Sequence, residues 1–378
     1  MNHKEPDYIP LMFKWGQRGF IKDTRWLNEF ERAKTELKLG LDPLLQLGYD
    51  PAWKLNPEVK VKLWRENLVD GEDHPLLIKE YHTRKGVLKQ IVRQTRDWPY
   101  GDYVPLRDDF ILPHNRSKKY LIENMNDLEA YDALFYDPTE KEQEQYLEEA
   151  EDLKKFADEH GFLISNTTGG MALTDAAIYA LGMENMFSLV FRNPELINRL
   201  LDILLEWNLK YLRQILEAKT IDVLNYQGWC ESYFPVKQYK TIIAPRVKKI
   251  IDMAHKFGVK VCYTPRDPPF SLYDMFRDIG IDIFWGCDPR SSAKYFSRIK
   301  QTVGDKICFW GGVNSQVTLG TGTKKQIEDE TIDAIRTLGP GGGFILSAFD
   351  YLDGYTPWKN IEHMIRVWRK NRRYPIDI

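Results

Sequence analysis

The sequence predicts an α/β protein of the TIM (β/α)8-barrel class, with an N-terminal extension or cap that includes a β-hairpin. In the second half of the chain, amphipathic helices alternate with short apolar strands, which is the pattern of a parallel sheet covered by helices. The length of 378 residues suits one large barrel with an extension, or two ordinary domains. An open doubly wound sheet would usually carry a glycine-rich phosphate turn after an early strand, and none is present.

The second half supplies the clearest elements. Asn193 can cap a helix, Pro194 suits its first turn, and an apolar face continues through residues 196–219. Further helices are expected at residues 236–257, 271–280, 293–303, 324–338 and 357–371, and strands at residues 221–226, 259–263, 281–285, 307–311 and 344–347. These strands should carry Leu224, Val261, Ile283, Phe309 and Ile345. The glycines of residues 339–343 precede the last strand, so we interpret them as a helix stop and turn.

The first half is less regular. Residues 76–81 and 87–94 alternate around the turn at 83–86 and predict the β-hairpin. Residues 140–160 predict an acidic helix and residues 162–165 a strand, while residues 8–12 and 41–48 fit early strands or helical turns. We expect residues 1–110 to mix the first barrel elements with a cap over the barrel mouth, within a single domain spanning residues 1–378.

Composition excludes several classes of protein. A formal net charge of -2 gives no indication of a nucleic-acid or membrane-surface partner. The N-terminus has no apolar segment after its charges, and no run suits a membrane span, so a cytoplasmic location is expected. Four widely spaced cysteines, Cys230, Cys262, Cys287 and Cys308, do not predict a disulfide framework and suit small buried core residues.

From residue 162 onward the sequence resembles the uroporphyrinogen decarboxylase superfamily. The matching pieces are short stretches in a fixed order: residues 193–195, 225–231, 244–245, 259–263, 280–282, 303–306, 311–314, 342–346 and 356–361. The resemblance implies a barrel with its active site at the carboxyl ends of the strands. It also implies one of two activities, decarboxylation without a cofactor or methyl transfer to or from a corrinoid protein.

The residues that carry these two activities in the superfamily differ here. Its zinc-binding methyltransferases use a His-x-Cys pair and a later cysteine, and these positions fall on Thr264, Arg266 and Asp350. Threonine and arginine are not ordinary zinc ligands, so we expect no metal at this position, although a site built from Cys230 or Cys287 with carboxylates stays open. The decarboxylase arginine that follows Met12 is replaced by Phe13.

Polar residues that follow the predicted strands are the candidates for the active site, because barrel enzymes place their catalytic groups there. We expect Asp350, Arg266 and Glu231 to be catalytic, with Asp350 or Glu231 as a general acid and Arg266 orienting an anion or an ether oxygen. Substrate-binding candidates are Arg18, Asn225, Gln227, Trp229, Tyr263, Thr264, Asp267, Asp288 and Asn314. Trp229, Trp285 and Trp310 could wall a pocket for an aromatic or methylated cationic substrate.

Each candidate also has a structural interpretation. Arg266 and Asp267 could form a rim ion pair, Glu231 a cap or a solvated carboxylate, Asp288 a helix cap, and the tryptophans part of the barrel packing. The favoured hypothesis is a corrinoid-dependent methyltransferase that demethylates a small methoxy or methylamine compound. It needs a corrinoid protein as partner and no cofactor bound tightly to this chain. The alternatives are a cofactor-free decarboxylase of a smaller acid, with Arg266 holding a carboxylate, and a non-catalytic binding protein on a degenerate barrel.

Overall fold

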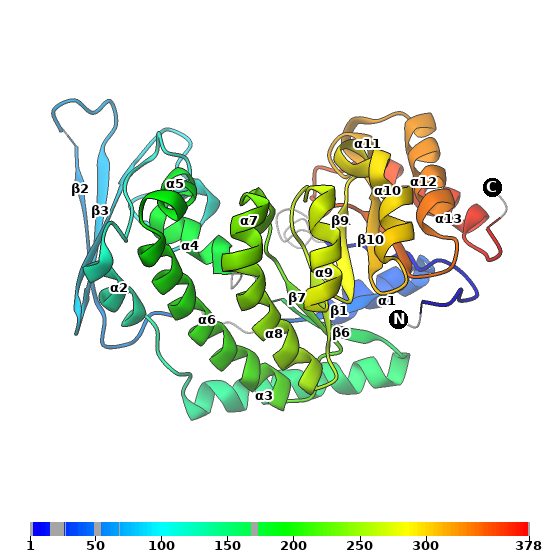
Figure 1. The fold of residues 1–378 in the computed structure, drawn as a ribbon, viewed down its shortest axis with the longest axis horizontal. Helices are drawn as coiled ribbons and strands as arrows, with labels where there is room; N and C mark the ends of the chain where they lie inside the picture. The colour runs from blue at the N-terminus through cyan, green and yellow to red at the C-terminus, as the bar shows by residue number, and fades with distance from the viewer. Residues whose placement is uncertain are drawn as a thin grey trace. The chain divides into compact units, whose positions relative to one another are not determined.

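The computed structural model describes residues 3–15, 26, 28–48, 54–67, 69–167 and 173–376 (Figure 1). The chain forms two compact units, each built from separate segments. The first unit comprises residues 1–48, 147–168 and 215–378, and the second comprises residues 49–146 and 169–214. The prediction of a single domain spanning the chain stays a prediction.

The first unit contains the barrel sheet. Its seven parallel strands are hydrogen-bonded in the order β1, β6, β7, β8, β9, β10, β11. They span β1 Leu44–Gly48, β6 Leu163–Thr167, β7 Val223–Tyr226, β8 Lys260–Tyr263, β9 Ile283–Cys287, β10 Cys308–Val313 and β11 Phe344–Ala348. Every residue of β7, β10 and β11 is buried, as expected for strands covered on both faces. The five residues placed on strands from the sequence lie on β7 to β11, which confirms the barrel class.

An extended segment takes the place of the expected eighth strand. The carbonyl of Pro10 accepts from the Leu346 N–H at 2.9 Å, and the Met12 N–H donates to Leu346 O at 3.1 Å. On its other side the Leu11 carbonyl accepts from the Asp42 N–H at 3.1 Å, two residues before β1. The segment therefore bonds toward both edges of the curled sheet. Pro10 lacks an N–H donor, so the segment forms isolated bridges rather than a continuous ladder.

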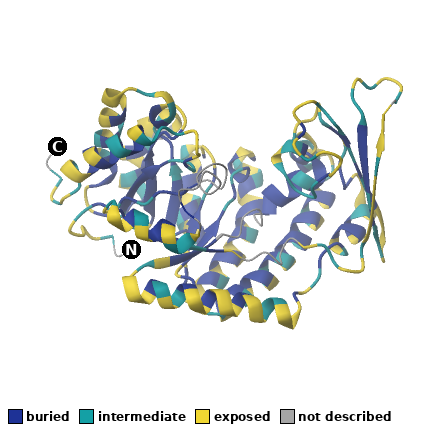
Figure 2. Ribbon diagram, turned by 180° about the vertical axis from the view of Figure 1, so that it is seen from behind, coloured by how far each residue is buried: buried dark blue, intermediate teal, exposed yellow. Residues whose placement is uncertain are grey.

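Helices surround this sheet. They are α1 Glu29–Lys38, α3 Glu140–His160, α7 Val236–Gln238, α8 Ala244–Lys256, α9 Tyr273–Ile279, α10 Pro289–Val303, α11 Thr318–Thr321, α12 Lys324–Leu338 and α13 Trp358–Asn371. Helices α8, α9, α10, α12 and α13 pack side by side in chain order (Figure 1). Their inner faces are buried and their outer faces exposed, while the strands are buried (Figure 2).

Two helices differ from their sequence-based bounds for local reasons. The single helix expected at residues 236–257 is divided by a π-helical turn at Tyr239–Ile243, directly before α8, whose first turn carries Pro245. Proline has no N–H for the usual i→i−4 bond, which favours an irregular turn there. Helix α10 begins earlier than expected because Asp288 caps it and Pro289 occupies its first turn.

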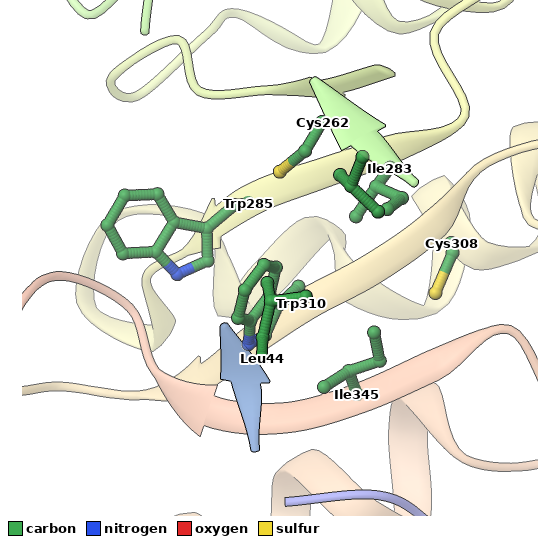
Figure 3. Packing of buried hydrophobic residues seen from close by; sticks show 8 residues of the cluster. Leu44, Cys262, Ile283, Trp285, Cys308, Trp310 and Ile345 are labelled. Atoms are coloured by element: carbon green, nitrogen blue, oxygen red, sulfur yellow. The ribbon is translucent and has the colours of Figure 1, made fainter. Parts of the chain in front are cut away.

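The interior of the barrel is packed by one hydrophobic cluster. It consists of Leu44, Val223, Cys262, Ile283, Trp285, Cys308, Trp310 and Ile345, which come from six of the seven strands (Figure 3). Trp285 of β9 and Trp310 of β10 are partners in the strand register, so both side chains lie on the inner face of the sheet. The four cysteines are free and buried, as the sequence indicated.

The second unit carries the predicted hairpin. Strands β3 Leu76–Thr83 and β4 Gly86–Arg93 pair antiparallel across the turn, which confirms this part of the extension. β2 Lys60–Glu66 and β5 Ser117–Lys119 complete a four-stranded sheet in the order β2, β3, β4, β5. The helices of this unit are α2 Met125–Asp132, α4 Leu173–Leu181, α5 Met183–Arg192 and most of α6 Pro194–Glu217. Within the described ranges, no helix is long and apolar enough to span a bilayer.

Candidate active site

Arg266 and Asp350 meet at the carboxyl ends of the barrel strands. Arg266 follows β8 and Asp350 follows β11, and Arg266 Nη2 lies 3.2 Å from Asp350 Oδ2. The guanidinium also lies 5.9 Å from the centroid of the Trp229 ring, and the Arg266 N–H donates to Trp229 O at 3.3 Å. Ser232 donates its hydroxyl to the carbonyl of Arg266. These contacts hold Arg266 at both its backbone and its side chain, as a residue that orients a ligand requires.

A cation that sequence reasoning missed lies inside the barrel. Lys14, on the segment that bonds toward both sheet edges, is 2% exposed. Its Nζ donates to Asn225 Oδ1 at 2.9 Å and lies 3.6 Å from the centroid of the Trp285 ring and 4.6 Å from that of Trp310. Burial lowers the pKa of the Lys14 ammonium to about 8, against a smaller raising effect of Cys262 and Asp350.

Trp15, the residue next to Lys14, is anchored by a buried ionic network. Trp15 Nε1 donates to Glu36 Oε1 at 2.5 Å, and Arg32 forms ion pairs with Glu36 and Glu29. Arg32 Nη2 also donates to the carbonyl of Leu44, the first residue of β1, at 2.8 Å. Burial raises the pKa of the Glu36 carboxyl to about 7, although Arg32 opposes that rise. The network fixes the segment that carries Lys14 to the edge of the sheet.

More polar groups gather at the same strand ends. Gln227, which follows β7, donates to the hydroxyl of Tyr351 at 2.6 Å, and the Tyr351 ring packs edge-on against Trp285 at 5.2 Å. Trp285 Nε1 and Ser347 Oγ are buried and have no hydrogen-bond partner among the residues that the structure describes. Buried polar groups are nearly always satisfied, so a ligand or a water molecule is expected to bind these two atoms.

Glu231 is buried away from the Arg266–Asp350 pair. Its carboxylate accepts from Tyr226 at 2.7 Å and from Tyr263 at 2.5 Å, and the Tyr263 hydroxyl lies 3.1 Å from that of Tyr239. The Tyr263 ring packs against Phe276 of α9, so this network lies between the sheet and its helices. Burial raises the pKa of the Glu231 carboxyl to about 7, although both tyrosines oppose the rise. The structure does not bring Glu231 to Asp350, and a catalytic role for Glu231 stays a prediction.

The other candidates make local contacts. Asp288 caps α10 through the Arg290 N–H at 3.0 Å and accepts from Asn314 Nδ2 at 2.9 Å, which matches the structural interpretation of Asp288. Asp267 has a φ of +45° and accepts a hydrogen bond from the hydroxyl of Ser291. The Thr264 N–H donates to Tyr226 O at 3.1 Å in the loop that carries Arg266. Arg18 lies outside the described residues.

The strand ends do not fit the superfamily's zinc site. Thr264 and Arg266 stand where the histidine and cysteine ligands would be, and Arg266 is paired with Asp350 instead. Over the ranges that the structure covers, no group of three His, Cys, Asp or Glu side chains could hold a metal ion. The described side chains at this site supply a guanidinium, a carboxylate, a buried ammonium and several hydroxyl and amide groups.

Comparison with known proteins identifies the relatives of this chain. The sequence model of the family described as "Uroporphyrinogen decarboxylase (URO-D)" matches residues 115–371. A curated uroporphyrinogen decarboxylase from Synechococcus sp. (strain CC9605) is 28% identical over 191 residues, which are 48% of this chain and 49% of the relative. The match thus spans about half the length of that relative. A solved "methyltransferase from Methanosarcina mazei" has a TM-score of 0.57 at 14% identity, covering 97% of this chain and 94% of that one.

Proposed function

The chain belongs to the uroporphyrinogen decarboxylase family, and we propose that it is a corrinoid-dependent methyltransferase. In this proposal it removes the methyl group of a small methoxy or methylamine compound and passes it to a corrinoid protein. The two proteins named above, a curated decarboxylase relative and a methyltransferase of similar fold, are enzymes, which supports a catalytic role over a binding protein on a degenerate barrel.

The observation that carries the proposal is the ion pair of Arg266 with Asp350 at the barrel mouth. A substrate with eight carboxylates would need several uncompensated cations. In the described part of the site, however, Arg266 is neutralised by Asp350, and the decarboxylase arginine is replaced by Phe13. Trp229 and Tyr351 supply aromatic surface that suits a small substrate rather than one with eight carboxylates.

The residues at the strand ends suit the leaving group of a demethylation. When the carbon–oxygen or carbon–nitrogen bond breaks, the electron pair remains on the leaving atom, which must be stabilised or protonated. The guanidinium of Arg266 can stabilise a developing oxyanion, and Asp350, whose carboxylate pairs with Arg266, keeps that guanidinium in place. The released oxyanion then takes its proton from water. The corrinoid on the partner protein would supply the nucleophilic metal that accepts the methyl group.

Methyl transfer is tested directly with isotopically labelled donors. The purified protein is mixed with reduced cobalamin and a panel of methoxy-aromatic, methoxy-aliphatic and methylamine compounds carrying a ¹³C methyl group. The proposal predicts labelled methylcobalamin, with the demethylated product in equal amount, from at least one donor. Release of carbon dioxide from the carboxylated donors, with the methyl group retained, would support the second candidate, a decarboxylase. The relation to the Synechococcus enzyme and the buried cation Lys14 favour that alternative.

A further inference from the structure

Two inward-facing tryptophans of the barrel already hold a cation that belongs to the protein. The sequence suggested that Trp285 and Trp310 could bind a methylated cationic substrate. In the structure, the ammonium of Lys14 lies 3.6 Å from the Trp285 ring centroid and 4.6 Å from that of Trp310 (Figure 3 shows the two rings). Because the aromatic surface is occupied by this ammonium, a second cation beside it would meet like-charge repulsion.

Lys14 also lacks a carboxylate partner within ion-pair distance among the described residues. Its ammonium donates a hydrogen bond to the neutral amide of Asn225, at 2.9 Å. Asp350 attracts the ammonium electrostatically, but its carboxylate is bound to Arg266. A buried cation is costly unless a charge of opposite sign accompanies it. Within the described part of the chain, the Lys14 ammonium therefore has no counter-charge of its own inside the barrel.

Unpaired hydrogen-bond donors lie on the same inner face of the sheet. Trp285 Nε1 is buried without a partner in the described part of the chain, and an indole N–H can only donate. Ser347 Oγ is likewise unpaired, and Ser347 lies on β11 two residues after Ile345, which belongs to the inner cluster. An acceptor-only group such as a carboxylate would satisfy the ammonium and these donors together.

We propose that Lys14 selects the charge of the substrate: it binds the carboxylate of a methoxy acid inside the barrel and disfavours methylammonium compounds. This inference rests on the proposed methyl transfer, which identifies the bound molecule as a methyl donor. It favours methoxy compounds over methylamines, the two classes of donor that the proposed function leaves open. Lys14 acts through substrate binding, while Arg266 and Asp350 act on the leaving oxygen.

The test measures equilibrium binding without any corrinoid, so its result is separate from that of the methyl-transfer assay. Isothermal titration calorimetry at pH 7 compares three probes of similar shape: 4-methoxybenzoate, neutral 4-methoxybenzamide and the cationic 4-methoxyphenyl-trimethylammonium. The wild-type protein should bind the benzoate at least about 10-fold more tightly than the amide and should bind the ammonium most weakly. A preference of this size corresponds to one hydrogen bond between charged groups.

Lys14→Met removes the charge while keeping a side chain of similar length, and the loss of a buried charge favours a folded variant. Its affinity for 4-methoxybenzoate should fall about 10- to 100-fold, while its affinity for the amide changes little. Lys79→Met is the matched control. Lys79 is also a buried lysine, 3% exposed, beside the rings of Tyr81 and Tyr103, but it lies in the second unit. Lys79→Met should keep the wild-type preference among the three probes.

Three results would overturn the inference. The first is tighter binding of the ammonium probe than of the benzoate by the wild-type protein. The second is an unchanged preference for the benzoate in Lys14→Met. The third is the absence of binding by 4-methoxybenzoate, methoxyacetate and acetate at millimolar concentration, since a cation short of a counter-charge should bind at least one of them. Methyl transfer could still occur in each of these cases, from a donor that is bound by groups other than Lys14.

Discussion

Replacing Glu231 with glutamine should change how the stability of the protein depends on pH. Burial raises the pKa of this carboxyl to about 7 in the folded protein, from 4.5. A raised pKa means that the folded state holds its proton more firmly than the unfolded chain does. The contribution of Glu231 to stability is therefore complete below about pH 4.5 and is lost as pH rises to about 7. At 1.36 kcal/mol per pKa unit, the loss amounts to about 3 kcal/mol.

The assay is urea unfolding of the wild-type protein and Glu231→Gln at pH 5 and pH 8. The amide can accept from one tyrosine and donate to the other, so the pocket formed by Tyr226 and Tyr263 is preserved. Between the two pH values, the free energy of unfolding of the variant should fall by about 2–3 kcal/mol less than that of the wild type, because part of the effect is already lost at pH 5. Glu36 has a pKa raised to about 7 as well, so the variant retains part of the pH dependence. Glu148→Gln, on the exposed face of α3, should behave like the wild type. An equal fall in wild type and Glu231→Gln would refute the assignment of a buried, protonated carboxyl.

Three further predictions concern the site and the fold. Asp350→Asn should lower turnover by about 10²–10³, the range for losing one oxyanion-stabilising group, because Arg266 loses the carboxylate that holds its guanidinium. Arg266→Lys should also be costly, since an ammonium does not reproduce the planar, bidentate hydrogen bonding of a guanidinium. Turnover near that of the wild type in steady-state assays would remove either residue from the mechanism. Elemental analysis should find no stoichiometric zinc, and about one zinc per chain that is lost in Asp350→Asn would contradict the interpretation of the strand ends. Gly182→Ala should destabilise the protein by roughly 1–3 kcal/mol in chemical denaturation, since Gly182 has a φ of +80° and an added Cβ would lie 2.4 Å from the Tyr120 ring. Gly161→Ala, with a φ of +71° and no atom within 4 Å, should cost less, and equal losses would show that the ring contact is unimportant.

Local patterns in the sequence were sufficient to predict much of the barrel. Short, largely apolar runs such as those around Val261 and Phe309 predicted buried strands, and the hairpin turn at residues 83–86 predicted the pairing of β3 with β4. The position of Arg266 opposite Asp350 also followed from topology, because both residues directly follow parallel strands and the carboxyl ends of such strands share one end of the barrel.

The missed features depend on contacts between distant parts of the chain. Lys14 lies in a short segment without periodicity, and its partner Asn225 is 211 residues away, so no local pattern indicates that its ammonium is buried. Glu231 lies in a 3-10 turn in the loop after β7, and its carboxylate accepts hydrogen bonds from Tyr226 and Tyr263. Sequence spacing places both residues near a strand end but does not decide the face on which each side chain lies.

The most direct test of the account follows the fate of 4-methoxybenzoate labelled with ¹³C in its methyl group. The acid is incubated with the protein and reduced cobalamin, and mass spectrometry measures the products. Methyl transfer from a donor held by Lys14 predicts 4-hydroxybenzoate and labelled methylcobalamin in equal amounts, with both lost in Asp350→Asn and reduced in Lys14→Met. Formation of methoxybenzene and carbon dioxide, with the labelled methyl group still on the ring oxygen, would contradict the account and identify the protein as a decarboxylase.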